Sequence, residues 1–224
     1  KPLYMRYIFN NIILKIKYKL EKRIAIFLTK LMIKLNGSYV KALLVESENQ
    51  FILVESEDMG VGRNLRINGD YGRNEKKYLK KLINKNSTVA FIGTHVGSLA
   101  IPMARIVKKA LLIEANPNTY KYLEANIKLN SLSNVQIFNI AVGEAVGEIK
   151  FILNVRNSGG SKREPVFKKK MYYKGNPKTV AVPMVTFDSL LVEPTEIFDL
   201  IFMDIEGSEY FALSGMQNSL KTAG

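Results

Sequence analysis

Three short segments with polar or acidic side chains each follow an apolar run. They are Gly93-Thr94-His95-Val96-Gly97, Glu114-Ala115-Asn116 and Asp204-Ile205-Glu206. If the runs are parallel strands, these segments meet at one edge of the sheet, where ligands bind in open α/β folds. The sequence therefore predicts one ligand site built from a glycine-containing loop and acidic side chains.

The loop after Ile92 does not fit a dinucleotide. That fingerprint needs glycines at positions 93, 95 and 98, but the chain has His95 and Ser98, and a histidine obstructs the approach of a pyrophosphate. A P-loop needs Gly-Lys followed by Ser or Thr, which is absent.

An adenosine ligand without phosphate fits better, and S-adenosylmethionine is such a ligand. Glu114 lies 21 residues after Gly93, one strand-helix-strand step, and its carboxylate can accept hydrogen bonds from both ribose hydroxyls. Gly93 and Gly97 are expected to let the backbone pass close to the methionine moiety.

The elements that must position these residues alternate regularly. Apolar periodicity predicts strands at 89–92, 110–114 and 134–142, separated by helices at 98–108 and 117–130. This order indicates an α/β, Rossmann-like fold with a doubly wound, mostly parallel sheet. Further strands are expected at 148–155, 179–185 and 198–203, a short helix capped by Thr186, and a last helix at 208–221.

The region before the sheet is expected to be simpler. Residues 39–58 predict a hairpin with its turn at 48–50, residues 60–74 a loop, and residues 75–83 a short helix. The predicted domains are a basic helical appendage at 1–36, a hairpin and lead-in helix at 37–87, and a core at 88–224 that is expected to lack its C-terminal strands.

Composition excludes several classes of site. The chain has no cysteine, so disulfides, thiolate metal sites and cysteine nucleophiles are excluded, and one histidine leaves little scope for zinc or a Ser-His-Asp triad. No metal site is predicted. The net charge is +13, but it is concentrated in residues 1–36 and in the cluster at 162–178. This distribution is unlike that of a uniformly basic nucleic-acid module, so nucleic acid is not the expected partner.

Residues 1–36 carry nine Lys or Arg against one acid, Glu21. A helical stripe contains Leu20, Ile24, Phe27, Leu28, Leu31 and Leu35. Lysines interrupt the apolar stretch too often for a membrane span. The helix could lie on an anionic membrane surface or could pack with its lysines in water. The expected location is the cytoplasm, with or without membrane contact.

From Glu75 onward the sequence resembles the FkbM family of S-adenosylmethionine-dependent methyltransferases. The resemblance rests on "VAFIGTHVGSLAIPMA", "LLIEANPNTYKYLEANIKLN", "VQIFNIAVGEAVGEIKF", "NSGG", "VPMVTFDSLL" and "FDLIFMDIEGSEYFALSGM". It implies a class I methyltransferase fold and methyl transfer to hydroxyl oxygens of sugars, polyketides or lipid-linked glycans, so the expected partner is such a small-molecule, glycan or lipid acceptor.

The resemblance also implies roles for single residues. The cofactor loop corresponds to Gly93, Thr94, His95 and Gly97, the ribose acid to Glu114 with Ala115 and Asn116 beside it, the segment near the adenine to Ala141 and Val142, and the acid motif to Asp204, Glu206 and Gly207. The chain departs from the family pattern at four positions: Phe91 stands for Asp, Thr94 for Ala, His95 for Asn, and Phe202 for a frequent Lys.

The chemistry leaves alternatives open. Methyl transfer needs in-line positioning and a base for the hydroxyl proton. Asp204 and Glu206 are the candidates for that base, but they could hold a divalent ion, or Glu206 could cap the next helix while Asp204 fixes the loop. His95 could be a base or a hydrogen-bonding spacer. Asn157, Ser158 and Ser161 could touch the acceptor. The rival functions are an RNA methyltransferase and a non-catalytic binding domain.

Overall fold

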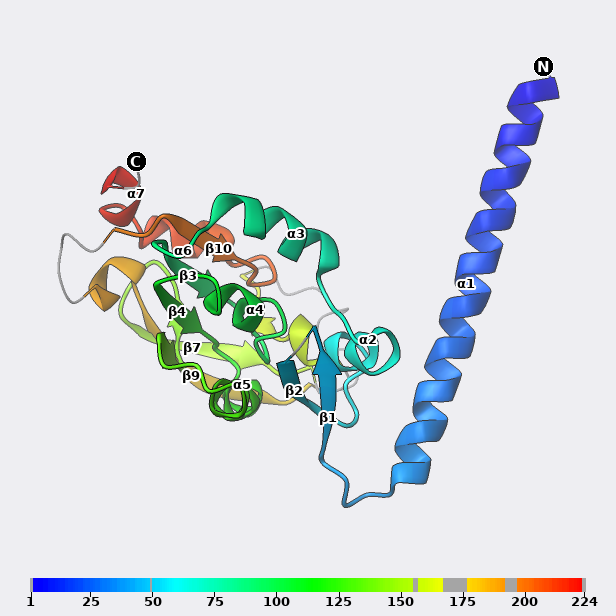
Figure 1. Cartoon of the computed structure of the whole chain (residues 1–224), viewed down its shortest axis with the longest axis horizontal. Coiled ribbons are helices and arrows are strands. Elements are labelled where there is room, and N and C mark those ends of the chain that lie inside the picture. Colours follow the sequence, from blue (N-terminus) through cyan, green and yellow to red (C-terminus); the bar gives the residue numbers. More distant parts are fainter. Residues whose placement is uncertain (1, 49, 155–156, 167–176, 192–196, 223–224) are drawn as a thin grey trace. The chain divides into compact units, whose positions relative to one another are not determined.

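The computed structural model describes residues 2–48, 50–154, 157–166, 177–191 and 197–222 of the chain (Figure 1). It separates into two compact units, residues 1–41 and residues 42–224. The predicted domain boundaries at 36 and 87 stay predictions. Lys168, Lys169, Lys170 and Lys174 of the second basic cluster lie outside the described residues.

Helix α1 (Pro2–Asn36) makes up nearly all of the first unit and confirms the predicted helix. A stripe of large apolar side chains on it is exposed, and these are Ile13, Ile16, Leu20, Ile24, Phe27, Leu31 and Leu35. Among the described residues, no helix has the length and apolar character needed to cross a membrane.

A parallel sheet lies at the centre of the second unit. Its strand order is β10 (Leu200–Met203), β3 (Thr88–Ile92), β4 (Lys109–Ile113) and β5 (Val135–Phe138). Alternate side chains of the central strands enter two different cores: Val89 and Phe91 pack on one face, Ala90 and Ile92 on the other. Both faces are therefore covered, as the continuous apolar runs require.

A second, mixed sheet has the order β6 (Ala141–Val142), β9 (Thr179–Val185), β7 (Gly147–Ile152) and β8 (Lys162–Arg163). The single strand predicted at 134–142 is therefore wrong, because its last two residues leave the parallel sheet and pair with β9 instead. The strand predicted at 148–155 ends at residue 152.

The hairpin forms as predicted, with β1 (Ala42–Ser47) antiparallel to β2 (Gln50–Glu55). The backbone groups at the outer edge of the hairpin are hydrogen-bonded by two asparagines. One lies in helix α5 (Pro117–Leu129), and the other is the C-terminal cap of that helix. The Asn126 amide exchanges hydrogen bonds of 2.7 and 3.0 Å with the Leu53 backbone, and Asn130 does the same with Phe51 at 3.1 and 2.7 Å. These side chains imitate a neighbouring strand and protect the edge.

The predicted loop at 60–74 is wrong. It contains α2 (Val61–Asn68) and the first turn of α3 (Arg73–Leu82). Four glycines, at 60, 62, 69 and 72, are typical of a loop and led to that prediction. Val61 and Leu65 nevertheless form the buried face of a helix. Gly69 ends α2 in the left-handed conformation, a frequent helix stop.

Two other helices are shorter than predicted. The helix at 98–108 reduces to α4 (Ala100–Ala104), and the last helix divides into α6 (Glu209–Ser214) and α7 (Ser219–Thr222). Gly215 lies between the latter two, where a side chain would overlap the carbonyl oxygen of Gly143. The predicted cap is confirmed, since Thr186 accepts a hydrogen bond from Ser189 N at the start of the 3-10 helix η3 (Phe187–Leu190).

Candidate functional site

A cavity of about 270 Å³ opens at the carboxyl ends of β3, β4 and β10. The chain order reverses between β3 and β10, so this is the switch point of the sheet. Most predicted site residues line the cavity: Gly93, Thr94, His95, Glu114, Ala115, Ala141, Val142, Asp204 and Glu206. Gly97 and Asn116 are not among its lining residues.

The two loop glycines lie where the backbone is closely packed. A side chain at Gly93 (φ 85°) would overlap the carbonyl oxygen of Asp204, and one at Gly97 (φ 88°) would press on Ile101 and Leu123. Both glycines therefore allow close packing inside the protein. Gly93 lines the cavity and Gly97 does not, and the expectation that they make room for the methionine moiety stays a prediction.

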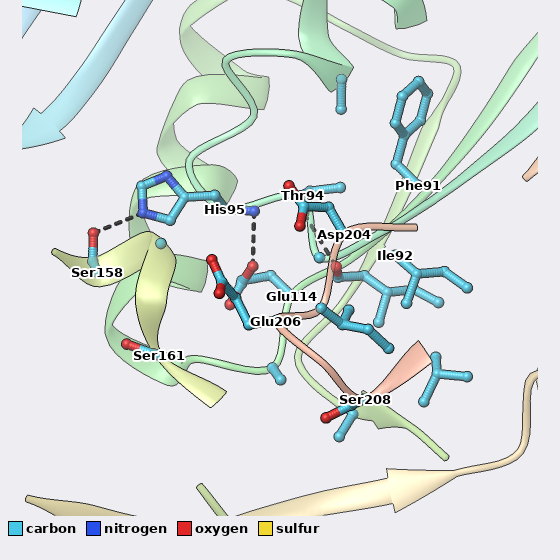
Figure 2. Close-up of a pocket in the computed structure, with 18 of the residues that line it drawn as sticks. Phe91, Ile92, Thr94, His95, Glu114, Ser158, Ser161, Asp204, Glu206 and Ser208 are labelled. Atoms are coloured by element: carbon cyan, nitrogen blue, oxygen red, sulfur yellow. Dashed lines mark hydrogen bonds between the residues drawn. The ribbon is translucent and has the colours of Figure 1, made fainter. Parts of the chain in front are cut away.

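Glu114 is the buried acid of the cavity, with 7% of its surface exposed. Its two carboxylate oxygens accept hydrogen bonds at 2.7 Å, one from His95 N (Figure 2) and the other from Asn116 N. Burial raises the pKa of Glu114 to about 7, although both backbone hydrogen bonds act to lower it. A carboxylate has about four acceptor positions, so two remain for a ligand.

Asn116 supports the site from behind. Its side-chain oxygen accepts from Asn118 N at 3.0 Å and caps α5, where Pro117 occupies the first turn. Its amide nitrogen lies 3.3 Å from Ser161 Oγ. Asn116 therefore joins the end of β4 to the segment after β7 and acts as a positioning residue.

His95 belongs to a hydrogen-bonded chain. Its Nε2 lies 2.7 Å from Ser158 Oγ (Figure 2), and Ser158 donates in turn to Asp58. Burial lowers the pKa of His95 to about 4, against the opposing effect of Asp58. Because Ser158 gives its proton to Asp58, its oxygen accepts from His95 Nε2–H. This arrangement favours a neutral spacer over a base.

Asp58 is the residue that the sequence analysis missed. It is 1% exposed, and its carboxylate accepts from Gly60 N and Gly62 N at 2.8 Å and from Ser158 N at 2.9 Å. The pattern Asp58-Met59-Gly60 followed by a helix is typical of a side-chain-supported turn and could have revealed it. Asp58 holds the start of α2 and the 3-10 helix η1 (Ser158–Gly160) together beside the cavity.

Asp204 and Glu206 stand at the mouth of the cavity. Partial burial raises the pKa of both, and neighbouring carboxylates, including Glu209, raise them further. The loop itself is held by Glu209, which accepts from Ile205 N at 3.1 Å and Gly207 N at 3.3 Å. Glu206 therefore does not cap the helix. In the described part of the chain, neither mouth carboxylate has a hydrogen-bond or ion-pair partner.

Two departures from the family pattern are neighbours in space. Phe91 and Phe202 are register partners on β3 and β10, and their ring centroids lie 5.7 Å apart. The family pattern has a charged residue at each of these two positions. In this chain two aromatic rings stand there and contact each other. The departures are thus a matched pair, and they leave the carboxylates of the cavity in place.

The second basic cluster is only partly solvated. Arg163 makes a bidentate ion pair with Glu144 at 2.7 and 2.8 Å, and its guanidinium lies 4.1 Å from the ring centroid of Phe211. This arginine therefore packs the second sheet against α6 and is not available as a simple exposed charge.

A family model described as the methyltransferase FkbM domain matches residues 92–223, more than half of the chain. The chain belongs to the FkbM methyltransferase family. It is therefore an S-adenosylmethionine-dependent methyltransferase domain, and its parallel α/β sheet is the class I methyltransferase core that the resemblance implied.

Other similarities are shorter. An uncharacterized protein of Methanocaldococcus jannaschii is 36% identical over 62 residues, and a tRNA(Phe) (4-demethylwyosine(37)-C(7)) aminocarboxypropyltransferase of that organism is 41% identical over 63 residues. The two matched segments cover 28% and 27% of this FkbM-family chain. They cover 24% and 25% of the two relatives, so the chain spans about a quarter of the length of each relative. A methyltransferase FkbM structure from Methylobacillus flagellatus gives a TM-score of 0.41 at 16% identity, covering 62% of this chain and 31% of that one.

The residues present fit the family's cofactor. S-adenosylmethionine carries a ribose with two hydroxyl donors, and the buried Glu114 carboxylate has two acceptor positions left in the cavity. The cofactor is also cationic at sulfur, and the cavity is lined by three carboxylates, those of residues 114, 204 and 206. We propose Glu114 as the ribose ligand, and Thr94, His95, Ala115, Ala141 and Val142 as the remaining walls.

We predict that cofactor affinity depends on the ionisation of Glu114. Because burial raises its pKa to about 7, the carboxyl is protonated below that pH and must lose the proton to accept both ribose hydroxyls. Calorimetric titration should show affinity falling about tenfold per pH unit below pH 7 and remaining level above it. Glu114→Gln should bind weakly at every pH, while Glu148→Gln, an exposed control, should titrate like the native chain. An unchanged affinity in Glu114→Gln would contradict the ribose assignment.

Proposed function

We propose that the domain transfers a methyl group from S-adenosylmethionine to an uncharged hydroxyl of a sugar, a lipid-linked glycan or a secondary metabolite. The observation that carries the proposal is the pair of carboxylates, Asp204 and Glu206, at the mouth of the cavity that Glu114 lines, neither of which has a partner among the described residues. Such groups suit a reaction in which a hydroxyl must lose its proton.

The chain's own residues would position the hydroxyl and take its proton. Bound S-adenosylmethionine supplies the methyl group as an electrophile. Partial burial and neighbouring carboxylates raise the pKa of Asp204 and Glu206, which makes each a stronger base than an ordinary surface acid. The loop amides held by Glu209 keep both carboxylates at the mouth.

The charge around the mouth favours a neutral acceptor. Asp204 experiences the negative charges of Glu209 and Glu75. Glu206 experiences those of Asp204 and Glu209, opposed by the positive charge of Lys162, so carboxylates outnumber the cations that act on the two groups. A phosphate at this position would add a further negative charge at short range. A hydroxyl brings no such cost and can donate directly to a carboxylate.

RNA is the second candidate acceptor. It is favoured by the 41% identical segment of the tRNA aminocarboxypropyltransferase and by the net charge of +13. This relative weakens the expectation that nucleic acid is no partner. An RNA acceptor would predict tight binding that salt weakens steeply, whereas a neutral hydroxyl acceptor would bind with little dependence on salt.

We predict that Asp204→Asn or Glu206→Gln slows methyl transfer by about 10²–10⁴-fold, because the hydroxyl then lacks its base. Transfer of labelled methyl groups would be measured against a panel of glycans, lipid-linked glycans, hydroxylated metabolites and transfer RNA. Glu148→Gln serves as the control for loss of a surface acid. Native rates in both mouth variants would refute the base assignment, and labelling of RNA alone would replace the hydroxyl acceptor.

We also propose that α1 contacts an anionic membrane surface. Its exposed apolar stripe is flanked by exposed Lys15, Lys19, Arg23, Lys30 and Lys34. If two copies of this helix paired, their basic side chains would repel each other. An anionic membrane can bury the apolar stripe among its acyl chains and attract the basic side chains with its headgroups.

The contact can be tested by sedimenting the full chain with vesicles. Binding should be strong for vesicles containing phosphatidylglycerol, weak for pure phosphatidylcholine, and reduced by salt. The double variant Phe27→Ser, Leu31→Ser should lose binding, while Leu129→Ser, an exposed position on α5, should not. Equal binding to both vesicle types, or none, would contradict the proposal.

A further inference from the structure

A second, shallower hollow adjoins the cofactor cavity. It encloses about 520 Å³ and is lined by Asn64, Asn68, Asp70, Tyr71, Gly72 and Arg73. Asn64 and Tyr71 line both spaces, so they form the boundary between them. None of these residues lies in the segment that the family model matches, which begins at residue 92.

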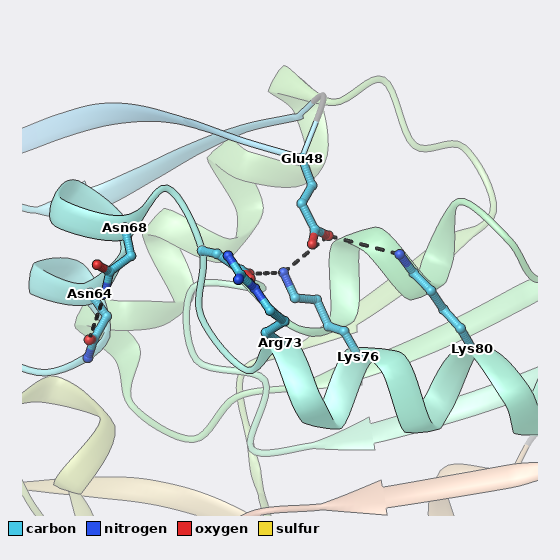
Figure 3. Close-up of polar contacts among 7 residues, drawn as sticks. Glu48, Asn64, Asn68, Arg73, Lys76 and Lys80 are labelled. Atoms are coloured by element: carbon cyan, nitrogen blue, oxygen red, sulfur yellow. Dashed lines mark hydrogen bonds and ion pairs between the residues drawn. The ribbon is translucent and has the colours of Figure 1, made fainter.

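The hollow has a rigid frame. Lys76 of α3 is 2% exposed and pairs with Asp70 and, at 3.2 Å, with Glu48 of the hairpin turn (Figure 3). Arg73 Nε donates to Asp70 at 2.9 Å. Burial raises the pKa of Asp70, but the hydrogen bonds from Lys76 and Arg73 outweigh it and hold that pKa below its ordinary value. The loop between α2 and α3 is therefore fixed from both sides.

Tyr71 stands in the middle of this fixed loop. It lies between Gly69 and Gly72, which both adopt left-handed conformations, and 38% of its surface is exposed. Burial and the nearby charge of Asp204 raise the pKa of Tyr71, so its hydroxyl stays protonated, and the residue lines the cavity as well as the hollow. A ring held in this place can be covered by a ligand whose reactive end reaches Asp204.

The polar side chains of the hollow both donate and accept. Asn64 gives one amide hydrogen to Gly60 O at 3.0 Å and lies 3.5 Å from the Asn68 amide, and Asn68 is exposed (Figure 3). Adjacent hydroxyls of a sugar present the same alternation of donor and acceptor as an amide side chain. Arg73 and Lys76 both pair with Asp70, and Lys76 pairs with Glu48 as well, so two cations face two carboxylates, which favours an uncharged ligand over a phosphate.

We propose that this hollow is a glycosyl subsite, in which Tyr71 covers one face of a sugar ring and the amides of Asn64 and Asn68 bind its hydroxyls. The subsite rests on the proposed hydroxyl methyltransferase function and narrows it to acceptors that carry a sugar next to the methylated position. It places the recognition of the acceptor in residues 64–73, outside the matched family segment.

The test is saturation-transfer nuclear magnetic resonance on the full chain, with methyl glycosides of glucose, galactose, mannose, rhamnose and N-acetylglucosamine as probes. At least one glycoside should receive saturation, and glycerol, the polyol control, should not. Tyr71→Ala should abolish the signal and Tyr71→Phe should keep it, because the ring remains. Asn68→Ala should raise the dissociation constant about fivefold, the loss of roughly one hydrogen bond. The matched controls, Tyr78→Ala and Asn118→Ala at exposed positions, should bind like the native chain.

The outcomes separate the subsite from the proposed function. No glycoside signal, or signals unchanged in both Tyr71→Ala and Asn68→Ala, would overturn the subsite, and so would displacement of the glycosides by inorganic phosphate or by an RNA hexamer at lower concentration. Methyl transfer to a hydroxylated lipid without glycoside binding would overturn the subsite and leave the methyltransferase proposal standing. Glycoside binding that Tyr71→Ala abolishes supports the subsite even if no methyl transfer is found.

Discussion

The close approach of Asp204 to Gly93 is the constraint on which the site depends. The carbonyl of Asp204 occupies the space where any side chain at position 93 would lie, so the ends of β3 and β10 meet without a gap. This contact directs the loop of residues 204–207 over the cofactor loop. It places the carboxylates of Asp204 and Glu206 in the same cavity as Glu114, which directly follows the neighbouring strand β4. A larger residue at 93 would separate these groups.

The walls of the cavity are completed by parts of the chain that precede the sheet. Asp58 accepts hydrogen bonds from backbone amides at the start of α2 and of η1 and so holds the two together. Asn126 joins β2 to the cofactor loop through a 2.8 Å hydrogen bond to Val96 O. Lys76 joins the hairpin turn to the loop that carries Tyr71. These buried polar contacts join the hairpin, α2 and α3 to the cavity, so the part of the second unit that precedes β3 belongs to the site as much as the strands do.

Sequence patterns predicted the parts of the fold that are locally encoded. The strand and helix alternation from 88 to 130 was predictable because both faces of the strands are buried and Asn116-Pro117 is a clear helix start. The break at Gly215 was not, because it lies where the backbone of the distant Gly143 approaches closely. Helix α2 was missed because its glycines mask a short amphipathic pattern.

The candidate site shows the same division. Glu114, Asp204 and Glu206 could be placed from strand ends, and the family motif added Ala141 and Val142, all of which line the cavity. Gly97 packs against the core and Asp58 bonds to Ser158 across 100 residues of sequence, and both contacts depend on the folded chain, whereas the cap formed by Asn116 is a local pattern. The pairing of Phe91 with Phe202 likewise became visible only when the strands were set in register.

The central claim is that this cavity holds S-adenosylmethionine despite the altered loop. The most direct test is calorimetric titration of the folded chain at pH 8 with S-adenosylmethionine and with its demethylated product. We predict that both ligands bind one-to-one with micromolar dissociation constants. No heat of binding from a chain that melts cooperatively would contradict it, because the residues that line the cavity would then be present and correctly folded without holding the cofactor.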